Sequence, residues 1–520
     1  MKQVVLLVVA VLAIPASASN FPKDDRAIVH VLSRMSFGPR PGDVERMRRL
    51  GIQRYIDEQL RPERIPDGAA AARLAGLTTI GMSSRQISEQ FEIPQLAARK
   101  QKKQDAKNDG DPATTLEGGG KQPADPMQVR AASVILELSE QKLLRAVYSE
   151  RQLQEVLTDF WFNHFNVDAR KGSTRFMITE YERETIRPHV LGTFRDLLGA
   201  TAKSPAMLFY LDNWMSADPD AMNVARPFQV RVGRPERPAP QKKGLNENYG
   251  RELMELHTLG VDGGYTQKDV TEVARALTGW TIDKPRQGGG FTFNPRIHDT
   301  GQKIVLGYVI KAGGGESDGE RVLDILAKQP ATATFVATKL ARRFVSDTPP
   351  PALVERAAKR FRDSDGDLRE VMRAILTSPE FLAPDAYRVK IKTPFEFVVS
   401  ALRATGADVH DARPLVREVQ TLGMPLYMCQ PPTGYKDTGD AWVNTGALVS
   451  RMNLALRLTS GQVRGTDIRN PESAIRDPQS AIQVLLNGDA SETTRATVSK
   501  ATDAPKMIAL TLGAPEFQRR

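Results

Sequence analysis

Hydrophobic side chains recur at the spacing of a helix along almost the whole chain. Ile28, Val31, Leu32 and Met35 form one such stripe near the start, and residues 322–326 repeat the pattern. Alternation of the strand type is rare by comparison. The pattern therefore predicts a mainly α protein, a large multi-helix, bundle-like domain with a few short strands or hairpins.

Residues 1–18 have the pattern of a secretory signal peptide. A basic Lys2 precedes an apolar run from Val4 to Ile14, and Ala16 and Ala18 supply the small residues of a cleavage site. The run is too short to span a bilayer, and no later segment is apolar for long enough to do so. We therefore expect an exported protein, periplasmic or secreted, without a transmembrane span after cleavage.

Polar and turn-forming stretches divide the rest of the chain into predicted parts. Residues 101–128 are poor in apolar side chains and rich in Gly, Pro, Lys and Asp, which favours a flexible insertion. The predicted parts are the signal peptide at 1–18, an N-terminal helical part at 19–100, the flexible insertion at 101–128, a central helical part with the polar motif region at 129–310, a C-terminal helical part at 311–460 and tail helices at 461–520.

Two helix starts are marked by their capping residues. Thr266 with Asp269 has the spacing of a capping box before an apolar run. The acidic segment at 363–367 has some features of a calcium loop but lacks the remaining ligand spacing. Asp367 as the N-cap of the helix that follows explains this segment better.

The segment at 245–257 gathers an unusual number of polar residues on one predicted helix. On a helical wheel, Glu247, Asn248, Arg251, Glu252 and Glu255 fall inside one arc of roughly 140°. One interpretation is a solvated ladder of opposite charges at i, i+4 and i+8. The other is that Glu252 and Glu255 point two carboxylates into a pocket while Arg251 and Asn248 orient them, for a metal or for acid/base chemistry.

The opposite face of this predicted helix is apolar. Leu253 and Leu256 form the stripe that would pack on a core, and Gly260 has the position of a C-terminal cap. His257 lies about 140° from Glu252 on the same wheel. His257 is therefore not expected to be a partner of either carboxylate.

Two histidines elsewhere are candidates to complete a metal site. His164 lies among aromatic residues in DFWFNHFNVD, and His298 precedes Asp299 in a loop that leaves a short hairpin. A divalent metal held by His164, Glu252, Glu255 and His298 would suit Zn, Fe, Mn or Ca. Asp299 would orient His298, and Arg251 or Lys303 would hold an anionic substrate group. The catalytic candidates are Asn248, Arg251, Glu252, Glu255, Asp299 and Lys303.

Composition narrows the choice of partners. The formal net charge is +10, with Lys and Arg scattered along the chain, which favours anionic neighbours such as an envelope polymer. Nucleic acid is not expected outside the cytoplasm. Cys429 is the one cysteine of the chain, so no intrachain disulfide forms and no thiolate metal cluster is expected. No base lies near Cys429 in the sequence, and we interpret it as a packing residue.

Several long strings of the sequence resemble one bacterial family. They are VLSRMSFGPRPGDVERM, FWFNHFNV, NENYGRELMELHTLGVDGGYTQKDVTEVARALTGW, HDTGQKIVLG, PATATFVATKLARRFVSD, GDLREVMRAILTSPEF, KTPFEFVVSALRATG and QPPTGYKDTGDAWVNTGALVSRMN. They resemble the bacterial domain of unknown function 1800. The resemblance implies a large, mostly helical, exported protein, often encoded beside an exported family that resembles sulfatases and phosphatases. It implies no particular activity.

The family pattern falls mainly on the polar motif and its neighbours. The matching positions are His164, Asn246, Glu247, Asn248, Arg251, Glu252, Glu255, His257, Gly279, Trp280, His298, Asp299 and Lys303. The chain departs from the pattern in two places. Gly250 stands where an alanine is usual, which would loosen the helix, and the segment at 429–435 ends in PPTGY where a tryptophan is expected after the glycine.

Two classes of function follow from these features. The first is an exported metal-dependent enzyme with a Glu/His pocket, where a hydrolase and an oxidoreductase fit equally well. The second is a noncatalytic envelope protein whose polar helix face holds helices together or docks a co-exported, sulfatase- or phosphatase-like partner. Binding of an anionic polysaccharide by the basic surface is a further alternative, and its affinity would fall steeply with salt.

Overall fold

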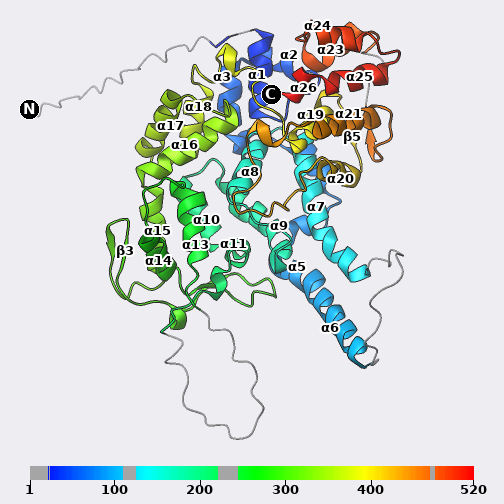
Figure 1. Ribbon diagram of the computed structural model, residues 1–520. Coiled ribbons are helices and arrows are strands. Elements are labelled where there is room, and N and C mark those ends of the chain that lie inside the picture. The colour runs from blue at the N-terminus through cyan, green and yellow to red at the C-terminus, as the bar shows by residue number, and fades with distance from the viewer. Residues whose placement is uncertain (1–20, 23, 109–124, 221–243, 469–474) are drawn as a thin grey trace, which may run out of the picture.

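The computed structural model describes residues 21–22, 24–108, 125–220, 244–468 and 475–520, which form the helical assembly in Figure 1. The predicted signal peptide at 1–18 lies outside the described residues. Helices dominate the described chain, and strands occur only as short pairs, so the prediction of a mainly α protein is confirmed.

The first half of the described chain is mainly helical. Their bounds are α1 Asp25–Met35, α2 Asp43–Leu50, α3 Ile52–Gln59, α4 Gly68–Leu74, α5 Ser84–Ile87, α6 Ile93–Asn108, α7 Pro126–Tyr148, α8 Gln152–His164, α9 Ile178–Glu180, α10 Phe194–Lys203, α11 Pro205–Tyr210, α13 Glu247–Met254 and α14 Gln267–Ala276. Three π-helical segments interrupt or extend them: η3 Ser88–Glu92, η5 Tyr181–Ile186 and η8 Glu255–Leu259.

The second half is also helical. Its helices are α15 Glu316–Ala327, α16 Pro330–Phe344, α17 Pro351–Asp363, α18 Leu368–Leu376, α19 Pro394–Ala404, α20 Arg413–Thr421, α21 Thr445–Thr459, α23 Pro478–Leu486, α24 Glu492–Val498, α25 Ala504–Gly513 and α26 Pro515–Gln518. Single 3-10 turns along the chain are η1 Pro62–Arg64, η2 Thr79–Gly81, η4 Gly172–Phe176, η6 Arg187–His189, η7 Asn213–Met215, η9 Pro295–Ile297, η10 Pro384–Ala386 and η11 Gly439–Ala441.

Six short strands form three antiparallel pairs. The strands are β1 Trp280–Ile282, β2 Phe291–Phe293, β3 Lys303–Val305, β4 Tyr308–Ile310, β5 Asp408–Val409 and β6 Thr466–Asp467. β1 pairs with β2 in the register Trp280↔Phe293, β3 pairs with β4, and β5 pairs with β6. The first pair is the hairpin that the alternating phenylalanines predict ahead of His298.

The larger of two hydrophobic clusters in the described residues runs from Ile28 in α1 to Phe517 in α26 and forms the main core. α8 lies near its centre in Figure 1, between the α16 to α18 layer and α7. Leu153, Leu157 and Trp161 of α8 are almost fully buried and, four residues apart, form one apolar face that packs in the core. This core includes residues from several of the predicted parts of the chain, and the boundaries between those parts stay predictions.

The predicted flexible insertion at 101–128 is wrong at its two ends. α6 continues to Asn108, and α7 begins at Pro126 with Asp125 as an N-cap that accepts from the Met127 amide. The Lys- and Gln-rich start of the segment continues a helix because these residues are good helix formers on a solvated surface. Residues 109–124 of the predicted insertion lie outside the described residues.

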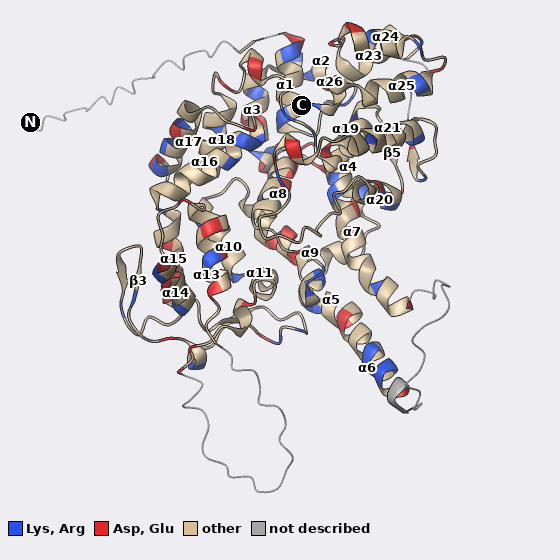
Figure 2. Cartoon of the chain, viewed as in Figure 1, with Lys and Arg blue, Asp and Glu red and all other residues tan. Residues whose placement is uncertain are grey.

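Charged residues are interspersed rather than segregated. Figure 2 shows Lys and Arg side by side with Asp and Glu along most helices, as the scattered sequence pattern predicts. Within the described part of the chain, no helix is both long enough and apolar enough to cross a membrane.

Candidate functional site

A cavity of about 390 Å³ lies where the last turn of α8 meets α16 and the loop at 433–438. We name it the histidine pocket. Its lining residues are Phe160, Asn163, His164, Lys339, Arg342, Thr433, Gly434, Tyr435, Lys436, Asp437 and Thr438. The pocket thus joins the FWFNHFNV and PPTGY segments, which are far apart in the sequence.

Asn163 holds the loop of the histidine pocket in place. Its Nδ2 donates to the Tyr435 carbonyl, and its Oδ1 accepts from the Tyr435 amide, both at 2.7 Å. Gly434 permits this approach, because its φ is +73° and an added Cβ would lie 2.2 Å from the Asn163 carbonyl oxygen. Asn166 donates to the Pro431 carbonyl at 2.9 Å. Two amide side chains of one motif therefore position the loop by backbone hydrogen bonds.

His164 is buried at the end of α8 with one ring nitrogen unused. Its Nε2 lies 3.1 Å from the carbonyl oxygen of His257, which can only accept, so Nε2 carries the proton. Burial, with the nearby Lys339 charge, holds the pKa of His164 well below its usual range, so the ring is neutral. Nδ1 then presents a lone pair, and this atom has no hydrogen-bond partner in the described structure. A ligand donor would satisfy it.

Lys339 brings an unpaired amine to the same pocket from α16. Its Nζ lies 5.5 Å from the centre of the Phe335 ring, and no carboxylate of the described residues forms an ion pair with it. Burial lowers the pKa of Lys339 to about 8, against a smaller raising effect from Asp437. Near neutral pH this amine exchanges its proton more readily than an ordinary lysine.

The charge of the histidine pocket is positive. Lys339, Arg342 and Lys436 line it, and Asp437 is its one acidic residue among those that line it. Asp437 already lies 3.5 Å from the Arg343 guanidinium on the other side. Arg342 uses its Nε on the carbonyl of Asp347 at 3.1 Å and forms no ion pair with a described carboxylate. The pocket therefore has cationic groups to spare for an anion.

The polar motif forms a helix, but with a change of pitch at its end. α13 runs from Glu247 to Met254, and residues Glu255–Leu259 then form the π-helical turn η8, which ends at Gly260 with φ +82°. A π-helical turn takes in extra residues, so the predicted wheel fails after Met254. As a result His257 is buried at 2% exposure, while Leu256, predicted to face the core, is partly exposed.

Much of the polar face of α13 packs on α14. Glu247 accepts from Gln267 Nε2 at 2.8 Å and from Thr271 Oγ1 at 2.9 Å. Arg251 donates to Gln267 Oε1 at 2.7 Å. The predicted ladder of ion pairs between Glu247, Arg251 and Glu255 does not form in the described structure, because α14 supplies the partners instead.

Gly250 is needed where the two helices meet. A Cβ at this position would lie 2.9 Å from the Val270 carbonyl oxygen of α14. The missing methyl group thus allows the close approach of α13 and α14, whereas the predicted loosening of the helix stays a prediction.

Glu252 and Glu255 keep carboxylates free for further contacts. Glu255 accepts from the Tyr265 hydroxyl at 3.2 Å, and Glu252 has no hydrogen bond or ion pair in the described structure. Burial raises the pKa of Glu252, and the charge of Glu255 adds to the rise. Asn248, predicted to orient them, is exposed. Glu252 also contributes to the raised pKa of Tyr210, whose hydroxyl donates to Gln430 at 2.8 Å beside the pocket loop.

His298 belongs to a separate, saturated cluster. Its Nδ1 lies 2.7 Å from the Thr278 carbonyl, and its Nε2 lies 3.3 Å from Asp318 Oδ2. Lys303 is fully buried and donates to the same Asp318 oxygen at 2.7 Å. We name His298, Lys303, Asp318, Asp299 and Arg275 the His298 cluster. Lys303 is thus occupied by protein groups rather than turned toward a cavity.

The carboxylate partner of His298 is Asp318, which corrects the expectation that Asp299 orients it. Asp299 accepts instead from the Arg275 guanidinium, with Nε–Oδ2 at 2.6 Å and Nη2–Oδ1 at 3.1 Å. Its own amide donates to Thr278 Oγ1 at 2.8 Å. His298 and Asp299 are neighbours in the sequence but bind different partners. Asp318 of α15 has the role that was expected of Asp299.

The four predicted metal ligands do not come together. Among the residues that the structure describes, no three His, Cys, Asp or Glu side chains form a group that could hold a metal ion. His164 lies in the histidine pocket, His298 lies in its own cluster, and Glu252 and Glu255 lie on α13 and η8. The prediction that His164, Glu252, Glu255 and His298 form one metal site is therefore wrong for the described structure.

A family model described as "Protein of unknown function (DUF1800)" matches residues 30–519. The chain belongs to the DUF1800 family. The match contains every residue of the histidine pocket and of the His298 cluster, so both are parts of the family domain. No curated protein and no solved structure gives a match to the chain.

The DUF1800 sequence pattern points to His164 but not to its partners in the pocket. Lys339 lies in PATATFVATKLARRF, where it has the appearance of an ordinary basic residue of an amphipathic helix. Asn163 and Tyr435 are 272 residues apart. The one local sign was PPTGY, whose glycine and prolines indicate a fixed turn, and this turn forms the rim of the pocket.

Proposed function

We propose that the protein binds a small anionic, hydroxyl-bearing molecule in the histidine pocket, such as a sugar acid or a sugar phosphate. One observation carries the proposal: the same cavity is lined by an unpaired lysine and by a histidine that has a buried ring nitrogen without a hydrogen-bond partner among the described residues. Neither the Lys339 amine nor His164 Nδ1 has a hydrogen-bond or ion-pair partner among the described residues, and one ligand with two functional groups would bind both.

The positive lining argues for the anionic group. Lys339, Arg342 and Lys436 surround one side of a partly enclosed space, and a charge-assisted hydrogen bond in such a space is stronger than one in water. A guanidinium with free Nη atoms suits a carboxylate or phosphate in a bidentate arrangement. The anion would also relieve the cost of holding the Lys339 charge in a half-buried place.

The histidine argues for the hydroxyl group. A neutral imidazole with its proton on Nε2 accepts a hydrogen bond at Nδ1, so the ligand must donate there. Sugars present a donor within a few atoms of an acidic group. A cavity of about 390 Å³ is also of the size that holds one small ligand.

An exported protein would meet such ligands in the cell envelope. The pattern of residues 1–18 favours export, and the net charge of +10 favours anionic surroundings. We therefore place the protein in the periplasm or outside the cell and regard acidic envelope glycans, or fragments of them, as the source of the ligand. A co-exported sulfatase- or phosphatase-like partner would hydrolyse sulfate or phosphate esters on such glycans and so expose hydroxyl groups on them.

The test is calorimetric titration of the purified protein with D-glucuronate, D-glucose 6-phosphate and uncharged D-glucose. We expect binding of the two anions and weak or absent binding of glucose. Lys339→Gln and His164→Gln should each weaken binding about tenfold or more, since each removes a charge-assisted or buried hydrogen bond. Lys328→Gln removes an exposed lysine just before α16 and is the matched control.

Two results would overturn the proposal. Glucose that binds as tightly as glucuronate would show that the cavity does not select charge. Unchanged affinity in folded Lys339→Gln protein would place the anion elsewhere. Measurement at two salt concentrations separates a specific pocket from general attraction to a basic protein, which falls more steeply with salt.

The lowered pKa of Lys339 favours a second candidate, an enzyme that acts on the same ligand by proton transfer. A lysine with a pKa of about 8 can accept and return a proton near neutral pH. Incubation of the protein with each bound sugar, followed by NMR, would distinguish the two candidates. New sugar signals that depend on Lys339 would indicate catalysis, and an unchanged ligand would indicate binding alone.

A further inference from the structure

A second cavity, of about 560 Å³, lies between α4, α7 and the residues that lead into α20. None of its lining residues belongs to the histidine pocket. We name it the Glu140 pocket. It is lined by Ala72, Arg73, Gly76, Leu77, Ser133, Leu136, Glu137, Glu140, Leu144, Val409, His410, Asp411, Ala412 and Arg413.

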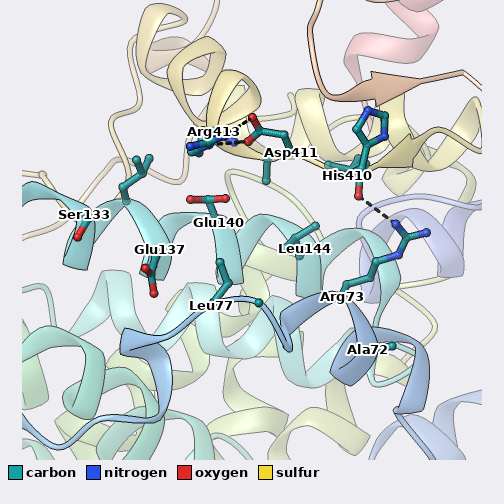
Figure 3. A pocket seen from close by; sticks show the side chains of 14 residues that line it. Ala72, Arg73, Leu77, Ser133, Glu137, Glu140, Leu144, His410, Asp411 and Arg413 are labelled. Carbon is teal, nitrogen blue, oxygen red and sulfur yellow. Dashed lines mark hydrogen bonds and ion pairs between the residues drawn. The ribbon is translucent and has the colours of Figure 1, made fainter. Parts of the chain in front are cut away.

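Glu140 is the unusual group in this cavity. It is only 8% exposed, and it has no hydrogen bond or ion pair in the described structure. Figure 3 shows its side chain on α7 reaching toward Asp411 and Arg413 across the cavity. A buried carboxylate is normally paired, because an unpaired one loses much of its hydration without compensation. Glu140 therefore presents to the cavity a carboxylate that has no hydrogen-bond or ion-pair partner among the described residues.

The cations in the Glu140 pocket are already used by other acids. Arg413 binds Asp411 through two hydrogen bonds of 2.8 Å. Arg73 pairs with Asp408 and donates to the Val409 carbonyl at 3.1 Å. Neither guanidinium is within ion-pair distance of Glu140, although Arg413 partly offsets its charge.

The remaining titratable groups of the lining do not neutralise Glu140 either. Glu137, one turn earlier on α7, accepts from the Thr79 amide at 2.7 Å and from the Thr79 hydroxyl at 2.9 Å, and it forms no ion pair with a cation of the described residues. His410 is exposed, and its Nδ1 lies 3.9 Å from Asp467. Within the part of the chain that the structure describes, Glu137 and Glu140 thus line the cavity without a cationic partner.

We propose that the Glu140 pocket binds the primary ammonium group of an aliphatic amine. An ammonium has three donors and one charge, which match the unpaired carboxylate of Glu140 and the nearby acceptors. The rest of the lining supplies an apolar surface for the alkyl stem, through Leu77, Leu136, Leu144 and Ala412. The ligand is either a free diamine or the side chain of a lysine, since both present the same chemistry.

The proposal implies a dependence of binding on pH. Burial raises the pKa of Glu140 to about 7, with Asp411 and Glu137 adding to the rise and Arg413 opposing it. Only the ionised carboxylate attracts an ammonium. Affinity should therefore rise about tenfold between pH 6 and pH 8, as the ionised fraction of Glu140 rises.

The experiment is calorimetric titration of the full chain with 1,5-diaminopentane at pH 6 and pH 8. The uncharged control ligand is 1,5-pentanediol, which has the same length. Nα-acetyl-lysine methylamide tests the second source of the ammonium group, and preference for it over the diamine would identify a lysine side chain as the ligand. We expect the diamine or the lysine derivative to bind more tightly at pH 8, and the diol not to bind.

The decisive variant is Glu140→Gln, which keeps the shape of the side chain and removes its charge. It should weaken amine binding about tenfold or more at pH 8 and abolish the pH dependence. The variant should fold, since a neutral amide is less costly to bury than an unpaired carboxylate. Glu45→Gln is the matched control, because it removes an equal charge from an exposed position of α2.

The outcomes that would overturn the proposal are clear in advance. Equal binding of diol and diamine would show that the cavity recognises the apolar stem alone. Glu140→Gln protein that binds the diamine like the wild type, or Glu45→Gln protein that loses as much affinity, would show that the attraction is general. The absence of binding by both the diamine and the lysine derivative at pH 8 would show that the pocket does not bind an ammonium group.

Discussion

The histidine pocket and the His298 cluster contain the same residue types, but they differ in whether the polar groups of these residues have partners. Each contains a buried imidazole, a lysine and at least one carboxylate. In the His298 cluster, both ring nitrogens have partners, and Lys303 pairs with Asp318 at 2.7 Å. In the histidine pocket, His164 Nδ1 has no partner in the described structure, and Lys339 has no counter-ion there.

The difference shows that saturation of partners, rather than residue type, separates a structural cluster from a binding site. A buried network in which every polar group has a partner stabilises the fold, and removal of one member lowers the free energy of unfolding. An unsaturated one costs the protein stability that a ligand can restore. The following predictions test whether the two regions differ in this way, beginning with the largest effect.

Asp318→Asn should destabilise the protein most. The change removes the carboxylate that faces both Lys303 and His298, and it leaves a fully buried ammonium with only Asp299, at 3.6 Å, as an acidic neighbour. Breaking a buried ion pair on one side costs about 3 to 5 kcal/mol. Urea unfolding at pH 7 measures the loss.

Asp324→Asn on the same helix is the control for Asp318→Asn. Asp324 pairs with Arg195 at the surface, with its side chain 43% exposed. An exposed pair contributes about 1 kcal/mol or less. Equal losses in the two variants would mean that the His298 cluster is no more structural than a surface ion pair.

Lys339→Met, in the histidine pocket, should raise the free energy of unfolding, whereas Asp318→Asn lowers it. The pKa of Lys339 is about 8 in the folded protein and 10.5 for an unperturbed lysine, so the unfolded chain binds the proton more tightly. The penalty is full below pH 8 and disappears as the pH rises toward 10.5. Lys339→Met should therefore be more stable than the wild type by roughly 2 to 3 kcal/mol at pH 7.

The readout for Lys339 is the difference between the two unfolding free energies as a function of pH. The difference should shrink between pH 8 and pH 10, whereas Lys328→Met should show no such trend. Other buried lysines, such as Lys392 with a pKa of about 7, titrate alike in both proteins and cancel. A constant difference would show that Lys339 carries no buried-charge penalty.

Gly434→Ala should destabilise the pocket loop. An added Cβ would lie 2.2 Å from the Asn163 carbonyl, and the φ of +73° is unfavourable for alanine. We expect a loss of about 2 kcal/mol and weaker binding of glucuronate. Gly313, beside the His298 cluster, has φ +82° but open space around it, so Gly313→Ala should cost only about 1 kcal/mol. Thermal unfolding of both variants compares them directly.

The sequence predicts what local chemistry decides. The capping box of Thr266 and Asp269 forms as predicted, and Asp367 caps α18 by accepting from the Arg369 and Glu370 amides. Each depends on residues within one turn. The mainly helical fold and the cap at Gly260 were predictable for the same reason.

What the sequence cannot supply is contact between distant segments. Asp318 reaches His298 from 20 residues away and displaces Asp299 from its predicted role. The extra residue of η8 buries His257, and no periodicity marks a π-helical turn in advance. Lys339 enters the site only because α16 packs beside the end of α8, which is a property of the tertiary structure.

His164→Gln should have the smallest effect, and the effect appears only in acid. The folded protein keeps His164 neutral, whereas the unfolded chain takes up a proton below about pH 6.5. Protons therefore favour unfolding, and the wild type loses stability as the pH falls. His164→Gln removes one such contribution, so the loss between pH 6.5 and pH 5.5 should shrink by about 1 kcal/mol.

His257→Gln is the partner experiment, because the pKa of His257 is lowered by burial to about 3. His257→Gln should reduce the loss of unfolding free energy at acid pH to a similar degree. It should leave glucuronate binding intact, since His257 does not line the cavity. A slope unchanged in His164→Gln would mean that the imidazole is protonated in the folded protein. Nδ1 would then donate rather than accept, and the pocket would select a ligand with an acceptor at that point in place of a hydroxyl donor.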